Sequence, residues 1–189
     1  MGGRKGRLLV TAFLTRGRMG SFADAIRLSE ATGASPATAD VRRYQGRPGV
    51  GLDLEQALSD DLGLFLRAGV ADGHLEPFDF TDIDQTVAGG LSLSGARWGR
   101  KDDTVGLAGI VNGISKIHEE YFADGGLGIL VGDGKLPHPG PEEVVETYYQ
   151  YAINPHWALS LDGQLIANPG YNRDRGPAPV VALRLHTQI

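Results

Sequence analysis

The sequence has no cysteine and no excess of basic residues. The lack of cysteine excludes disulfides and a cysteine nucleophile, and it weakly favours a compartment in which free thiols are a hazard. The 18 lysines and arginines are outnumbered by 23 aspartates and glutamates, which gives a formal net charge of −5. No broad basic surface is therefore available, and we predict no nucleic-acid partner.

Long hydrophobic runs are also missing. Although 41% of the residues are hydrophobic, no run of about eighteen apolar residues occurs, so the sequence predicts no transmembrane helix. A membrane barrel is still possible, because its strands alternate apolar and polar residues and so contain no long apolar run. The N-terminal segment "MGGRKGRLLV" is basic but lacks the apolar stretch and cleavage site of a secretory signal. If the protein is exported, we expect the chain to be a mature segment or a fragment.

Motifs for catalysis are missing too. There is no nucleophile elbow and no phosphate-binding loop, and "IHEE" around His118 lacks the second histidine of a zinc-binding helix. The segment "DFTDID" offers Asp79, Asp82 and Asp84 as oxygen ligands for calcium, but a solvated acidic loop is the simpler interpretation. We predict that the protein is not an enzyme and uses no cofactor or metal.

The sequence does contain clear alternation. In "ETYYQYAIN", Tyr149 and Tyr151 fall on one face of an extended chain, while Tyr148 and Gln150 fall on the other. After Pro155 the pattern restarts, with apolar residues again at every second position. A period of two predicts strands, in a soluble sheet as well as in a membrane barrel. Segments that alternate in this way predict strands at residues 7–16, 43–56, 61–71, 85–96, 103–112, 143–153, 156–167 and 178–189.

The connections between these strands alternate between long and short. Working back from the C-terminus, long connections such as "NPGYNRDRG" and residues 113–142 are separated by short ones such as "NP" and "LSDD". Outer-membrane barrels have this arrangement, with short periplasmic turns and longer external loops. We therefore assign "GLGILVG" at 126–132 to the long connection rather than to a ninth strand. Short helices are predicted at 21–33, capped by Ser21 and ended by Gly33, and at 115–122.

Aromatic residues gather beside the short connections. Tyr149, Tyr151 and Trp157 flank Asn154-Pro155 on the apolar face, and Trp98 lies in another short turn. Phenol and indole rings favour the headgroup level of a membrane, where they would form a girdle. The alternative is an ordinary, partly buried aromatic cluster.

Three blocks of the sequence carry a family resemblance. They are "GARWGRKDDTVGLA", "ETYY" and "NPGYNRDRGP", within a similarity that spans nearly the whole chain. The chain resembles the carbohydrate-selective porins of Gram-negative outer membranes, the OprB type. This resemblance implies an all-β, antiparallel up-and-down transmembrane barrel of sixteen strands. It also implies passive diffusion of glucose and related sugars across the outer membrane.

The eight predicted strands resemble the C-terminal half of such a barrel. Residues 1–189 are therefore interpreted as one porin-type barrel domain that forms the C-terminal portion of a longer barrel, whose N-terminal half and signal lie outside this sequence. The last residue is Ile189, where barrels of this kind usually end in an aromatic residue. An even strand count also permits a small closed eight-stranded barrel with a structural or adhesive role, its interior filled by side chains.

If the apolar face meets lipid, the polar face lines water. Carboxylate, amide and guanidinium groups can bind sugar hydroxyls, and Tyr148 or Phe65 can stack on a pyranose ring. Both charge signs occur, so a pore for ions of one sign is not indicated, and binding must stay weak for the solute to leave. The alternative for any one residue is a solvated wall without a role in selectivity. The candidate pore-lining residues are Asp53, Glu55, Arg67, Glu146, Tyr148, Gln150, Asp162, Gln164, Arg184 and His186, with Ser160 on the same face.

Three hypotheses remain at this point. The first is a sugar channel, or half of one, with small sugars and outer-membrane lipid as partners and homo-oligomerisation left open. The second is the small closed barrel, acting through its external loops. The third is a soluble sheet protein that binds a ligand in an apolar interior, in which Leu62, Leu64 and Leu66 would face inward and Arg67 outward.

The orientation of the 61–71 strand gives a first test. We expect Leu64→Arg to destabilise membrane assembly by about 2–4 kcal/mol if residue 64 lies near the bilayer midplane, because a charge would enter hydrocarbon. Urea titration of folding into lipid vesicles measures this. Normal assembly of the variant would argue against an apolar face in lipid.

Overall fold

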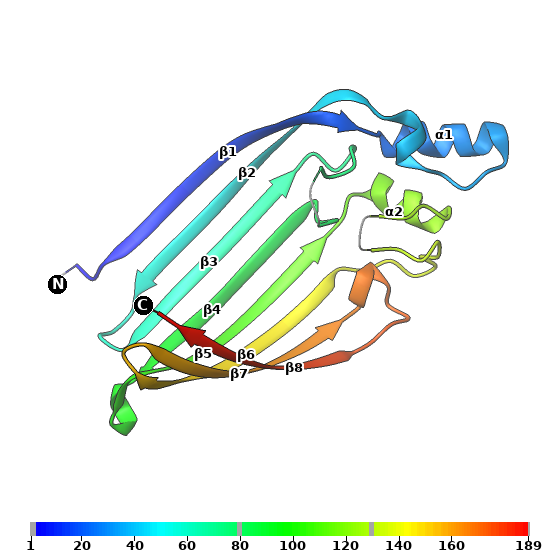
Figure 1. The fold of residues 1–189 in the computed structure, drawn as a ribbon. Coiled ribbons are helices and arrows are strands. Elements are labelled where there is room, and N and C mark those ends of the chain that lie inside the picture. Colours follow the sequence, from blue (N-terminus) through cyan, green and yellow to red (C-terminus); the bar gives the residue numbers. More distant parts are fainter. Residues whose placement is uncertain (1–2, 79–80, 129–130, 189) are drawn as a thin grey trace.

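The strands form one antiparallel sheet in which each strand is hydrogen-bonded to the next along the chain (Figure 1). The computed structural model describes residues 3–78, 81–128 and 131–188. The described sheet has eight strands in the order β1 to β8, which confirms the predicted up-and-down topology. The strands are β1 (Gly6–Met19), β2 (Arg43–Ala57), β3 (Leu62–Ala71), β4 (Gln85–Gly95), β5 (Arg100–Gly113), β6 (Glu142–Asn154), β7 (Trp157–Ala167) and β8 (Ala178–Thr187).

All long connections lie at one end of this sheet. Figure 1 shows α1 (Phe22–Thr32) and α2 (Lys116–Ala123) together at that end, where the long connections also carry the short 3-10 helices η1 (Thr38–Val41) and η3 (Pro169–Tyr171). The opposite end has only tight turns and η2 (Ala96–Trp98). Outside residues 129–130, which are not described, the 126–132 segment has no strand, as predicted. Among the described residues, no helix has the length and apolar character needed to cross a membrane.

The two helices begin and end where local sequence dictates. Ser21 caps α1, its hydroxyl accepting a hydrogen bond from the backbone N–H of Asp24 at 3.3 Å. Gly33 ends α1 in the left-handed conformation, with φ of 72°, which glycine adopts without strain. The hydroxyl of Ser115 caps α2 in the same way by accepting from the N–H of His118. Both helices were predicted from the sequence, α1 together with its caps at Ser21 and Gly33.

The buried apolar core lies in the layer of long connections, not on the sheet. We call the four connections at residues 20–42, 72–84, 114–141 and 168–177 the loop layer. Each helix buries three residues at spacings of three and four, the pattern of one helical face. The core residues are Phe22, Ala25, Ile26, Ile114, Tyr121, Phe122, Leu136 and Tyr171. This core therefore does not cover the apolar side chains of the sheet.

The sheet is open at both edges. β1 pairs only with β2, and β8 pairs only with β7, so the described strands do not close into a barrel. Both edges consequently present a row of backbone N–H and C=O groups without a strand partner. The number and direction of the strands match the prediction.

A buried carboxylate on the β3–β4 connection ties that connection to the β1–β2 connection within the loop layer. Glu76 accepts hydrogen bonds from the N–H of Gly20 at 2.7 Å, from the Thr38 hydroxyl at 2.5 Å, and from both Nε and Nη2 of Arg42. Burial alone would raise the pKa of Glu76, but these donors together hold it below its usual range.

A second buried carboxylate, Asp84, ties the same connection to β2 and α2. Its Oδ1 lies 2.9 Å from Arg47 Nη2, and its Oδ2 accepts from the N–H of Ser115 and lies 2.9 Å from His118 Nδ1. Burial would raise the pKa of Asp84, but His118, Ser115 and Arg47 lower it. His118 is fully buried and stacks on Phe22 at a centroid distance of 4.0 Å.

These contacts correct the interpretation of "DFTDID" as a solvated acidic loop. Asp82 and Asp84 are both buried, while Asp79 lies outside the described residues. The alternation of apolar residues could not predict this burial, because the carboxylates are compensated by Arg47 and His118, which lie in distant parts of the chain.

The lowered pKa values give a pH prediction. Because the folded pKa values of Glu76 and Asp84 lie below the unfolded ones, their contribution is complete above about pH 5 and is lost as the pH falls through the folded values. A spin label on Ala31→Cys, on the exposed side of α1, should become mobile in that acid range. Glu76→Gln should mobilise it already at pH 7. The exposed Glu120→Gln is the control, and equal behaviour of the two variants would contradict the prediction.

Candidate functional site

The strand register separates the sheet into a polar and an apolar face. Glu146 lies opposite Gln164, and Tyr148 opposite Asp162, on what we call the inner face. Leu161 lies opposite Leu183 on the other side, the outer face. Side chains alternate between the two faces along each strand. The register therefore places polar residues of adjacent strands side by side on the inner face, and apolar residues side by side on the outer face.

The outer face is a continuous apolar surface that no other part of the described chain covers. Leu8 pairs with Leu54 and Leu54 with Leu66, while at the other edge Val181 and Leu183 are 77% and 70% exposed. Leaving one such side chain in water rather than in an apolar medium costs roughly 1.5–3 kcal/mol. A face of this extent therefore requires an apolar medium around the sheet.

The position of Leu64 on β3 shows where an arginine substitution should cost most. Leu64 is on the outer face, paired with Leu91, but only two residues from the short-turn end of β3. Leu66 lies in the middle of the strand. Since the cost of a charge in lipid falls toward the interface, arginine at Leu66 should be the more damaging of the two changes.

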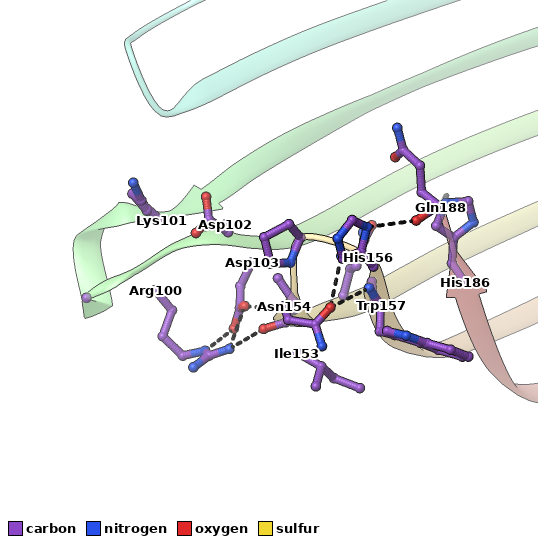
Figure 2. Close-up of a pocket in the computed structure, with 15 residues that line it drawn as sticks. Arg100, Lys101, Asp102, Asp103, Ile153, Asn154, His156, Trp157, His186 and Gln188 are labelled. Carbon is purple, nitrogen blue, oxygen red and sulfur yellow. Dashed lines mark hydrogen bonds and ion pairs between the residues drawn. The ribbon is translucent and has the colours of Figure 1, made fainter.

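Aromatic and charged side chains meet on the outer face at the short-turn end. The indole N–H of Trp98 donates to the Tyr149 hydroxyl at 3.3 Å, and the Arg100 guanidinium lies 3.9 Å from the centroid of the Tyr151 ring. Asp103 is buried beneath them and accepts from Arg100, as Figure 2 shows, and from Tyr149. Rings with one polar group each, backed by a compensated ion pair, suit the boundary between hydrocarbon and water.

One group of predicted pore-lining residues lies together on the inner face of β2 and β3. Arg67 Nε donates to Asp53 Oδ2 at 2.9 Å, and its guanidinium lies 5.2 Å from the centroid of the Phe65 ring. Arg7 of β1 reaches Glu55 at 3.3 Å. The charges on this side of the sheet are thus paired, and the aromatic ring lies beside them.

A second group lies on β6, β7 and β8. In addition to the opposed pairs of Glu146 with Gln164 and Tyr148 with Asp162, Ser160 lies opposite both Gln150 and Arg184. The group therefore presents carboxylates, amides, hydroxyls and one guanidinium on a single patch, a set able both to donate and to accept hydrogen bonds.

Small residues separate the two groups. On β4 and β5, Gly90 lies opposite Ala108 and Ser92 opposite Gly106. Aromatic rings from the flanking groups lie across two of these glycines, since a Cβ at Gly90 or Gly106 would overlap the ring of Phe65 or Tyr148. The glycines are what allow the rings to lie flat on the inner face.

One predicted residue, His186, lies apart from both groups, at the short-turn end. Gln150 and His186 line a hollow of about 680 Å³ beside the β6–β7 turn. Figure 2 shows His186 near His156, whose Nδ1 lies 3.1 Å from the carbonyl oxygen of Gln188. The turn itself is fixed by Asn154, whose side-chain oxygen accepts from two backbone N–H groups. His186 therefore lies at the mouth of the inner face, not in its middle.

Several inner-face polar residues escaped the sequence analysis. The Thr86 hydroxyl donates to Asn112 at 2.8 Å, and the Asn112 amide donates to Glu142 at 3.4 Å. These residues occupy inner positions at the long-connection end, and Arg7 occupies the first inner position of β1. Strict counting of every second residue would have found them. Within the described ranges, no group of three or more potential metal-ligating residues is present.

An up-and-down antiparallel sheet with an apolar outer face, a polar inner face and connections of unequal length at its two ends defines the class of outer-membrane β-barrel proteins. The chain belongs to one family within that class: the model for the carbohydrate-selective porins, the OprB family, matches residues 1–189. Membership implies the Gram-negative outer membrane, and a channel rather than an enzyme.

A solved structure has the same fold. The high-pH structure of Pseudomonas putida OprB superimposes with a TM-score of 0.76 at 17% sequence identity, covering 96% of this chain and 44% of that chain. This chain therefore spans less than half of the solved porin. A search of curated proteins finds no match.

Neighbouring residues of β7 test the assignment of faces. We expect Gln164→Cys to react readily with a water-soluble maleimide in lipid bilayers, and Leu165→Cys to react at least about tenfold more slowly, because the reactive thiolate does not form in hydrocarbon. The chain has no native cysteine, so each label is unique. In urea the two variants should react alike. Equal rates in the bilayer would refute the assignment.

Proposed function

We propose that this chain forms one half of the wall of a pore through which small carbohydrates such as glucose diffuse passively across the outer membrane. The observation that carries the proposal is the uncovered apolar outer face directly behind a polar inner face. An apolar surface of this extent supports contact with lipid, and the polar side then borders water.

The chemistry of the inner face favours neutral, hydroxylated solutes. Asp53 with Arg67 and Arg7 with Glu55 combine charges of both signs in close pairs, so neither sign dominates this side. Sugar hydroxyls donate and accept hydrogen bonds, which suits carboxylate, amide and guanidinium groups alike. Contacts spread over two separated groups give weak binding at each, as conduction requires. The proposed pore-lining set remains the ten residues predicted from the sequence.

A pore needs a second half to pair with the open edges. β1 runs from the short-turn end to the loop layer and β8 runs back, so further strands can pair with both edges and preserve the antiparallel alternation. We propose an N-terminal half of the same family as the partner, in keeping with the 44% of the solved porin that this chain covers. The open sheet disfavours the small closed barrel.

Planar-bilayer recording tests this function. The chain refolded together with the N-terminal half of a family member should give discrete conductance steps, and glucose should reduce them by occupying the water path. Asp162→Ala should change the glucose effect, while the outer-face control Leu165→Ala should not.

Each outcome of the recordings is informative. Steps from the chain alone would show that two copies can supply both halves. Open channels that are indifferent to glucose, or a silent bilayer with both halves inserted, would overturn the proposed function.

A further inference from the structure

Two exposed arginines, Arg16 and Arg18, lie on the outer face of β1 near its loop-layer end, which Figure 1 shows beside α1. In the register Arg16 lies opposite Gly46, and Arg18 lies opposite Tyr44. The four outer positions that precede them on β1 are all apolar: Leu8, Val10, Ala12 and Leu14. The two arginines therefore begin where the apolar part of this strand ends.

Strand geometry places both arginines at the level of lipid headgroups. At about 3.3 Å per residue, Arg16 lies about 7 Å and Arg18 about 13 Å beyond Leu14 along the strand. Arg16 is thus at the boundary of the apolar band and Arg18 is outside it, and long arginine side chains at such a boundary extend toward the headgroups. The long connections of outer-membrane barrels are external, so these headgroups belong to the external leaflet.

Contacts with β2 fix the direction of the Arg16 side chain. Its Cγ lies 3.9 Å from where a Cβ would sit on Gly46, so the aliphatic part of the side chain lies across this glycine. Its guanidinium carbon lies 6.0 Å from the centroid of the Tyr44 ring. Because Tyr44 is opposite Arg18, this contact turns Arg16 toward Arg18. The Tyr44 ring, which is 71% exposed, is therefore bordered by both arginines.

No carboxylate of the described residues neutralises these two arginines. Neither Arg16 nor Arg18 forms an ion pair there, whereas the inner-face arginines of the first three strands, Arg7, Arg47 and Arg67, are each paired with a carboxylate. Two like charges on successive outer positions repel each other, and an anion that binds both relieves this repulsion. Guanidinium groups bind phosphate with two parallel hydrogen bonds each, so phosphate is the anion that this arrangement fits best.

The positive charge is confined to one corner of the sheet. The outer positions nearest the loop layer on the other six described strands include no basic residue and one acidic residue. They are Val70, Gln85, Gly113, Glu143, Ala167 and Pro179. Arginines that served only to hold the sheet at the membrane surface would be expected on several strands. Their restriction to β1 therefore favours one ligand at one position.

We propose that Arg16, Arg18 and Tyr44 form a binding site for a phosphate group of the phosphorylated glycolipid in the external leaflet. The two guanidinium groups donate hydrogen bonds to the phosphate oxygens. Tyr44 holds Arg16 in position and lies at the headgroup level that tyrosine favours. The acyl chains of the same lipid then lie along the apolar outer positions of β1. This site is on the lipid side of the sheet, so it does not depend on which solute passes along the inner face.

Native mass spectrometry of the full 189-residue chain in neutral detergent micelles, titrated with bisphosphorylated lipid A, tests this site. Arg16→Gln together with Arg18→Gln should raise the Kd for lipid A roughly tenfold to thirtyfold, because two cationic contacts are lost. The corresponding double lysine variant should retain part of the affinity, since the charge remains without the two-pronged geometry. The matched control is Arg4→Gln with Arg97→Gln, which removes two exposed arginines at the short-turn end and should leave the Kd unchanged.

The comparison of ligands decides what occupies the site. Lipid A from which the phosphates have been removed should bind the native chain no better than it binds the double glutamine variant. Equal retention of phosphatidylglycerol, displacement of lipid A by inorganic phosphate at millimolar concentration, or no retention of lipid A by the native chain would each overturn the proposal. An equal rise of the Kd in the control variant would also overturn it, because net charge alone would then explain binding. Circular dichroism verifies the strand content of every variant.

Discussion

The hydrogen-bonded register of the eight antiparallel strands is the constraint on which everything else in the molecule depends. Once Tyr148 lies opposite Asp162, and Leu161 opposite Leu183, the period of two fixes which medium each residue meets. A slip of one residue would place leucines on the water side and carboxylates in lipid. The apolar outer face and the polar inner face are therefore consequences of one register, not separate features.

The loop layer cannot pack on the apolar face of the sheet, because that face is turned outward, so it needs its own stabilising contacts. It does so with a small core around Phe22 and Tyr121, and with Glu76 and Asp84 as buried points of attachment. Both carboxylates belong to the β3–β4 connection, which is also the segment that folds over the inner face. Glu76 and Asp84 thus fix the same connection whose Phe78 ring lies beside Gly17 on the inner face of β1.

Local patterns predicted much of this architecture because strand periodicity, helix caps and turn lengths are short-range properties. The eight strands, the caps at Ser21 and Gly33, and the side of the sheet on which Glu146 and Leu161 lie were all predicted from residues near them in the chain. The grouping of the inner-face residues was not predicted, because it depends on which strands are neighbours and at what register. His186 illustrates this: its face was predicted, but its location at the short-turn mouth follows from the end of β8.

The sequence by itself determined the alternation, and with it the strands, their number and direction, and the family to which the chain belongs. Only the tertiary structure decided that Asp84 and His118 are buried together, that Phe78 returns over Gly17, and that Arg16 lies over the ring of Tyr44. The physical reason is distance along the chain. Alternation acts between adjacent residues, whereas a buried ion pair or a guanidinium over an aromatic ring requires segments tens of residues apart to meet in space.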